Sequence, residues 1–89
     1  MAQQRQPPLR RSIGERLRNL RQEAGIPSQE ALAHRAGVHR TYIGRVERGE
    51  SGITVEMLAT ILAAMSVSLS DFFRPFAQPA QARTPRRRE

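Results

Sequence analysis

Apolar residues recur at helical spacing along the middle of the chain, from Ser12 to Phe73. Leu17, Leu20 and Ala24 follow one another at three or four positions, as on the buried stripe of an amphipathic helix, and no stretch alternates like a half-buried strand. The pattern predicts five helices, at about residues 12–24, 28–36, 39–48, 54–65 and 68–73. Short helices bury their stripes by crossing at steep angles around one centre. We therefore expect a compact all-α domain.

Residues that start and stop helices stand at the expected boundaries. Hydroxyl side chains that can accept from the first N–H groups precede four of the helices: Ser12, Ser28, Thr54 and Ser68. Glu15 completes a capping box with Ser12. Glycines, which readily adopt the left-handed conformation of a helix end, follow the first three helices: Gly25, Gly37 and Gly49.

The two ends of the chain are rich in proline and arginine, and they carry the charge. Residues 1–11 are predicted to be a flexible basic arm and residues 77–89 a flexible arginine-rich tail, which leaves residues 12–76 as the folded domain. Between Ser12 and Phe73 seven arginines balance seven acidic residues, so the net charge of +7 belongs to the ends. The charge alone predicts only nonspecific attraction to a polyanion.

Composition narrows the possible functions. The chain has no cysteine and two histidines, so neither disulfides nor a structural zinc site are expected. Cysteine nucleophiles, phosphate-binding glycine loops and an evident pair of catalytic carboxylates are absent, so we expect no enzyme, no cofactor and no small-molecule substrate. No signal peptide or membrane-length apolar run is present, which predicts a cytoplasmic protein without membrane contact. A domain this small gains stability from self-association.

The segment from Gln29 to Val46 has the spacing of a helix-turn-helix. Ala33 allows a close helix crossing, Gly37 supplies the sharp turn, and Ile43 and Val46 anchor the following helix in the core. This arrangement places two short helices at the steep angle typical of the motif. The helix at residues 39–48 is then the candidate recognition helix.

One face of that helix is polar and points away from Ile43. Arginine can donate two hydrogen bonds to guanine, and the threonine methyl can contact the thymine methyl. The outward residues are Arg40, Thr41, Gly44, Arg45 and Arg48. Taken alone the face could simply be solvated, but the helix-turn-helix spacing favours DNA contact. Gly44 could permit close approach to DNA or be merely tolerated, and Tyr42 could donate to a phosphate or pack beside the next helix.

Several short motifs make residues 13–73 resemble the phage-repressor family of helix-turn-helix proteins, which includes Cro and the lambda repressor. The motifs are Leu17-Arg-x-x-Arg21, Ser28-Gln-Glu-x-Leu-Ala33, Ala36-Gly-Val38, Thr41-Tyr-Ile43, Glu47-Arg-Gly49 and Val67-Ser-Leu-Ser-Asp-Phe72. Within the family, residues 39–50 are most similar to the controller proteins of restriction-modification systems. The resemblance implies a five-helix lambda-repressor-like fold and double-stranded DNA as the partner.

The resemblance also implies residue roles. Arg40, Thr41, Gly44 and Arg45 occupy positions that usually read bases, and Arg21 and Glu47 match a partly buried ion pair. Phosphate contacts are expected from Ser28, Gln29, His39, Tyr42 and Arg48. The connection from Gly25 to Gln29 is one residue longer than the family's usual Gly-x-Ser-Gln, so the approach of the second helix to DNA can differ.

The end of the domain gathers Met65 with three phenylalanines, Phe72, Phe73 and Phe76. These side chains could close the core or form a twofold interface, and we favour the interface because a minimal domain needs more burial. The sequence thus predicts a homodimeric, sequence-specific regulator of transcription on an inverted repeat. A restriction-modification controller and an antitoxin-type autoregulator remain open, and the alternative is a protein-binding adaptor without DNA contact.

Overall fold

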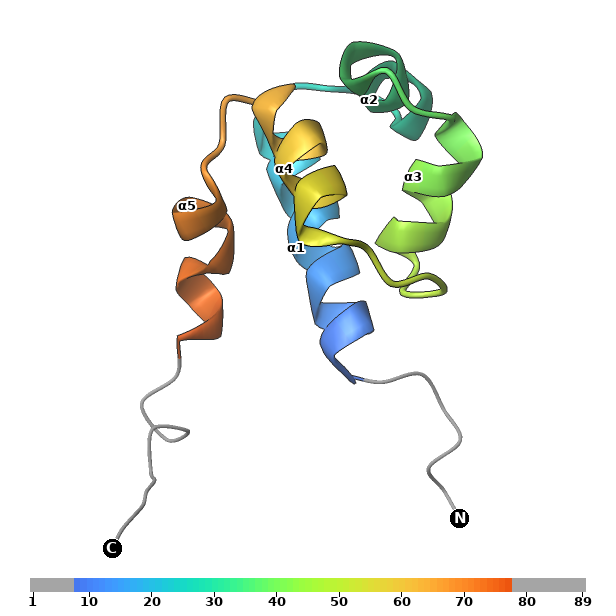
Figure 1. Ribbon diagram of the computed structural model, residues 1–89. Helices are drawn as coiled ribbons and strands as arrows, with labels where there is room; N and C mark the ends of the chain where they lie inside the picture. The colour runs from blue at the N-terminus through green and yellow to red at the C-terminus, as the bar shows by residue number, and fades with distance from the viewer. Residues whose placement is uncertain (1–7, 78–89) are drawn as a thin grey trace, which may run out of the picture.

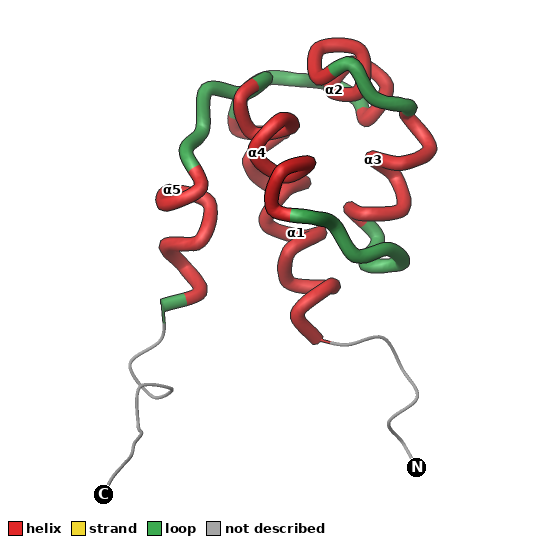
Figure 2. Tube along the Cα trace, in the orientation of Figure 1, coloured by secondary structure: helices red, strands yellow, loops and turns green. Residues whose placement is uncertain are grey.

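The computed structural model describes residues 8–77, and in that range the chain folds into helices joined by short loops (Figures 1 and 2). The elements are α1 (Pro8–Glu23), α2 (Gln29–Ala36), α3 (Arg40–Glu47), α4 (Val55–Ala63), α5 (Leu69–Phe73) and the short 3-10 helix η1 (Arg74–Phe76). Helices α2 and α3 lie on one side of α1 and α4, and α5 lies on the other (Figure 1). The prediction of an all-α, five-helix domain is confirmed. The predicted tails fall largely on residues 1–7 and 78–89, outside the described residues.

Three of the four predicted N-terminal caps are present. Ser28, Thr54 and Ser68 each accept a hydrogen bond at 3.0 Å from the backbone N–H three residues later. The three predicted glycines adopt positive φ of 74° to 76° at the helix ends. These local signals set the boundaries of α2, α4 and α5.

The start of α1 differs from the prediction. The helix begins at Pro8, so Ser12 lies inside it and the predicted capping box of Ser12 and Glu15 is wrong. Proline is favoured in the first turn of a helix because its missing N–H would have no partner there and its φ is already helical. Residues 8–11, assigned from the sequence to the basic arm, therefore extend α1.

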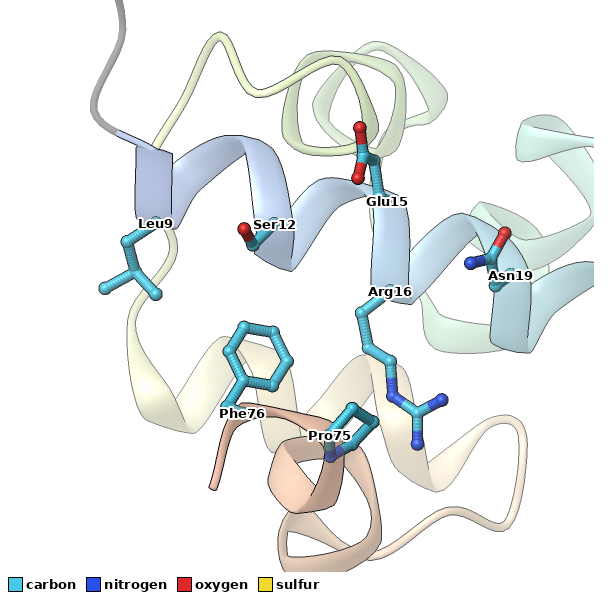
Figure 3. A pocket seen from close by; sticks show the side chains of 7 residues that line it. All are labelled: Leu9, Ser12, Glu15, Arg16, Asn19, Pro75 and Phe76. Carbon is cyan, nitrogen blue, oxygen red and sulfur yellow. The ribbon is translucent and has the colours of Figure 1, made fainter. Parts of the chain in front are cut away.

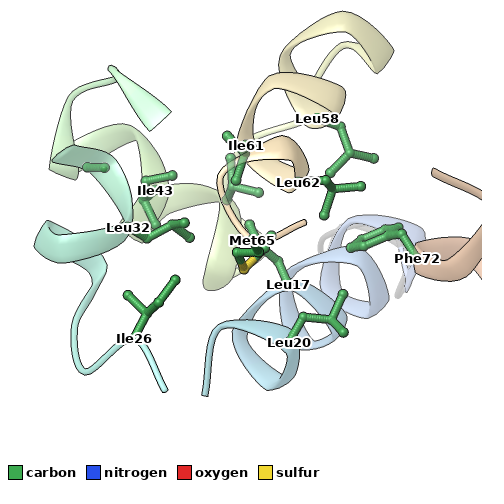
Figure 4. Packing of buried hydrophobic residues seen from close by; sticks show 12 residues of the cluster. Leu17, Leu20, Ile26, Leu32, Ile43, Leu58, Ile61, Leu62, Met65 and Phe72 are labelled. Carbon is green, nitrogen blue, oxygen red and sulfur yellow. The ribbon is translucent and has the colours of Figure 1, made fainter. Parts of the chain in front are cut away.

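A single apolar core joins the helices (Figure 4). Every α-helix contributes to it, and Ile26 joins it from the link between α1 and α2. Its buried members are Leu17, Leu20, Ile26, Leu32, Ala33, Ile43, Val46, Leu58, Ile61, Leu62, Met65 and Phe72. The core residues predicted within the helix-turn-helix are thus buried, and they hold α3 in place from its inner side.

The backbones of α1 and the end of α3 approach each other closely at Gly14. A Cβ atom on Gly14 would lie 2.4 Å from the carbonyl oxygen of Val46 and 2.6 Å from that of Glu47. Any side chain at this position would push the two helices apart. Gly14, which the sequence analysis did not single out, therefore sets the distance between α1 and α3.

We predict that Gly14→Ala lowers the free energy of unfolding by about 1–3 kcal/mol, because overpacking against backbone atoms forces a helix to shift. Gly44→Ala is the matched control, because its Cβ would meet only the ends of the Gln29 and Arg48 side chains. That control gains helix propensity of about 1 kcal/mol, which offsets the crowding. Urea denaturation measures both, and equal stability of the two variants would contradict this account.

Candidate nucleic-acid interface

The turn between α2 and α3 presents the recognition helix. Gly37 takes a left-handed conformation, with φ of 74°, and Val38 N–H donates to the Ala33 carbonyl at 3.0 Å. His39 then caps α3, its Nδ1 accepting from the Thr41 N–H at 3.2 Å. Since α3 packs on both α1 and α2, its direction is set from two sides.

The residues predicted to read bases differ in exposure. Arg40, Thr41 and Arg45 are exposed, which leaves their side chains open to a ligand. Gly44 is buried instead, covered by the side chains of Gln29 and Arg48. The expectation that Gly44 is an exposed position is therefore wrong, although it lines the same cleft as Arg40 and Thr41 and its contact with DNA stays a prediction. Its missing Cβ gives room for Gln29 to lie across α3.

Tyr42 is half-buried and packs against the core. This partial burial raises the pKa of Tyr42 above its ordinary value, because the phenolate would be poorly solvated. The hydroxyl stays protonated at neutral pH and can donate a hydrogen bond. Both sequence interpretations of Tyr42, as a packing residue and as a phosphate donor, are compatible with this position.

A polar cleft lies where the N-terminal ends of α2 and α3 meet. Its lining residues are Ser28, Gln29, Glu30, Arg40, Thr41, Gly44 and Arg48. Helix N-termini carry partial positive charge and free N–H groups, which suit an anion such as phosphate. The structure thus brings together most of the residues predicted to contact DNA, and adds Glu30, which the sequence analysis had not placed there.

A buried ionic network connects this cleft to α1. Arg21 Nε donates to Glu47 Oε2 at 2.8 Å and Arg21 Nη2 donates to Glu47 Oε1 at 3.2 Å. The two side chains are 8% and 1% exposed. Gln29 Nε2 donates to Glu47 Oε1 at 3.0 Å, so α1, α2 and α3 meet at one carboxylate. The contact between Gln29 and Glu47 is not evident from the sequence, because it spans two helices.

Another arginine ties α1 to the end of the domain. Arg16 Nε donates to the Phe72 carbonyl at 2.9 Å, and Nη2 donates to the Asp71 carbonyl at 2.8 Å. Figure 3 shows the side chain reaching from α1 toward Pro75. Arg16 thereby adds side-chain donors at the C-terminal end of α5, where the Asp71 carbonyl also accepts from the Arg74 N–H. Sequence reasoning missed it, since no local pattern signals a contact across 55 residues.

The four residues predicted at a twofold interface have different surroundings. Phe72 and Met65 are buried in the core, so they have almost no surface left for a partner and their assignment to an interface is wrong. Phe73 and Phe76 are half-buried, with ring centroids 5.3 Å apart. Phe76 also borders a groove along α1 with Leu9, which is 58% exposed (Figure 3).

In residues 8–77 no helix is long and apolar enough to cross a membrane. No group of three or more acidic or histidine side chains in the same range could hold a metal ion.

A short helix presented across a glycine turn, with arginines on its outward side, defines a helix-turn-helix domain. The chain belongs to the helix-turn-helix family, whose model matches residues 17–72. It is a DNA-binding regulator of this family and not an enzyme, as the sequence indicated. The resemblance stated from the motifs is thereby confirmed.

Among similar proteins, control protein C.BamHI of Bacillus amyloliquefaciens is 33% identical over 63 residues, 71% of this chain and 78% of that protein. Control protein C.SmaI of Serratia marcescens is 48% identical over 42 residues, 47% of this chain and 50% of that protein. The solved structure of the restriction-modification controller protein C.AhdI from Aeromonas hydrophila matches with a TM-score of 0.71 and 33% identity. The match covers 75% of this chain and 100% of the C.AhdI chain.

We predict that Glu47→Gln lowers the free energy of unfolding by about 3–5 kcal/mol, because it leaves the Arg21 guanidinium buried without its counter-charge. Glu50→Gln is the control, since Glu50 pairs with Arg48 on the exposed surface and such pairs contribute at most about 1 kcal/mol. Thermal or urea unfolding of both variants checks this difference. Similar losses in the two would show that burial of the Arg21 pair is unimportant.

Proposed function

We propose that this chain regulates transcription by binding an inverted-repeat operator as a homodimer, with Arg40, Thr41 and Arg45 reading bases in the major groove. The observation that carries the proposal is the exposure of these three side chains at the outward face of α3, beside the polar cleft. A helix of this length fits the major groove, and arginine and threonine are residue types that discriminate bases there.

The DNA backbone would run along the cleft where α2 and α3 begin. Phosphate contacts are proposed for Ser28, Gln29, His39, Tyr42 and Arg48. Gln29 already donates to Glu47, so its role includes holding the N-terminus of α2 at a fixed distance from α3. Free N–H groups in the first turn of α2 would supply phosphate donors as well.

The proposed dimer places two copies of α3 on successive turns of DNA. We propose that Phe73, Phe76 and Leu9 form the interface. These side chains leave apolar surface exposed on the side of α1 that faces η1. In a twofold dimer the two recognition helices would stand about 34 Å apart, one turn of the duplex. The operator would then be an inverted repeat.

The similar control proteins favour a controller of restriction-modification genes over an antitoxin-type autoregulator. We place its action in the cytoplasm, where a bacterial operator lies. An adaptor that has lost DNA contact is less well supported, because it would have no use for exposed Arg40 and Arg45 on the outward face of α3.

Selection from random duplexes tests the function. We expect the protein to enrich an inverted repeat, and Arg45→Ala to lose about 1–3 kcal/mol of binding and to relax one base pair in each half-site. Arg18→Ala, at an exposed position of α1, is the control and should select the wild-type sequence. If the wild-type protein enriches no common sequence, the proposal is wrong.

Sedimentation equilibrium tests the interface. Burying one aromatic side chain contributes about 1.5–3 kcal/mol and a twofold dimer contains two copies of Phe76, so Phe76→Asp should weaken the dimer at least about 100-fold. Val55→Asp places the same charge on an apolar residue of α4 that is 63% exposed, and should leave the dimer intact. If both variants dimerise like the wild type, the interface lies elsewhere.

A further inference from the structure

Two of the three arginines on the outward face of α3 are held by carboxylates of the protein itself. Arg40 Nη1 lies 3.6 Å from Glu30 Oε1. Arg48 Nε and Nη2 lie 3.1 and 3.3 Å from the carboxylate oxygens of Glu50. The third, Arg45, has no ion pair within residues 8–77. The reading face therefore offers much less free positive charge than its arginines suggest.

Glu30 differs from Glu50 in its position. It lines the polar cleft together with Ser28 and Gln29, where the DNA backbone is expected, whereas Glu50 lies outside the cleft lining. Its place in the first turn of α2 is one that the helix dipole favours for a carboxylate. A negative charge is thus built into the surface that a phosphate would approach.

We propose that Glu30 is a specificity-determining residue that competes with DNA phosphates for Arg40. This inference rests on the proposed role of Arg40 in reading bases. Nonspecific binding comes almost entirely from phosphate contacts, so a carboxylate that holds Arg40 weakens it directly. At the operator the pair is kept, because Glu30 lies against Nη1 of Arg40 and the Nε and Nη2 edge of the guanidinium can still make a bidentate contact to a guanine.

The exposure of the two side chains makes the pair easy to open on nonspecific DNA. The Glu30 and Arg40 side chains are 73% and 66% exposed, and ion pairs this exposed are weak and readily opened. Opening the pair therefore costs little, and the cost falls only on a site where Arg40 must leave Glu30 for a phosphate. It still biases Arg40 away from any site that offers only a phosphate. The neutral charge balance of residues 12–73 has the same effect on the domain as a whole.

The experiment compares Glu30→Gln with Glu23→Gln, using the selected operator and a scrambled duplex of equal length across a salt titration. Glu30→Gln should raise affinity for the scrambled duplex about two- to fivefold, leave operator affinity nearly unchanged, and steepen the nonspecific salt slope by about 0.9. Glu23→Gln makes the same change in net charge at an exposed site at the end of α1. It should leave the ratio of the two affinities unchanged.

A double-mutant cycle tests whether Glu30 acts through Arg40. In an Arg40→Ala background the effect of Glu30→Gln on the scrambled duplex should disappear, and full persistence would overturn the inference. A lower operator affinity for Glu30→Gln, with a changed base preference, would also overturn it, because Glu30 would then read a cytosine. Failure of the proposed function would look different, since the wild type itself would not distinguish operator from scrambled DNA.

Discussion

The buried salt bridge between Arg21 and Glu47 is the interaction on which the DNA-binding surface depends. Glu47 ends α3 and is nearly inaccessible to water, and its two carboxylate oxygens accept three hydrogen bonds, two from Arg21 and one from Gln29. Arg21 also donates to the Ile26 carbonyl at 3.2 Å. Removing these charges from water is costly, so the network adds little net stability compared with apolar residues. Its contribution is directional, because it holds α3 against α1 and α2 at once.

Two glycines make this arrangement possible. Gly14 allows the backbone of α1 to touch the last carbonyls of α3, next to Glu47. Gly44 leaves space for Gln29 to cross α3 and reach the carboxylate. The polar network, the glycine contacts and the apolar core therefore act on the same helix. The exposed side of α3 is not needed to hold the helices together, which suits a surface that must adapt to an operator.

Features that depend on local chemistry could be predicted from the sequence. The caps at Ser28 and Thr54, the Gly37 turn and the buried Ile43 follow from hydrogen bonding and helical period within a few residues. Features that depend on contacts between distant segments could not. Pro8 extends α1, Gly44 is covered by Gln29, and Phe72 turns into the core, each because of neighbours that periodicity does not reveal. The pairing of Arg21 with Glu47 was accessible only through the family resemblance.

The double variant Arg21→Met, Glu47→Leu tests whether the network orients α3. Replacing a buried ion pair with apolar residues of similar volume is often neutral or stabilising, so the variant should unfold near the wild-type midpoint. Operator affinity, measured on the same folded protein, should fall at least about tenfold, or 1.4 kcal/mol, because Gln29 loses its partner and α3 loses its fixed direction. A stably folded double variant that binds the operator with wild-type affinity would contradict the account.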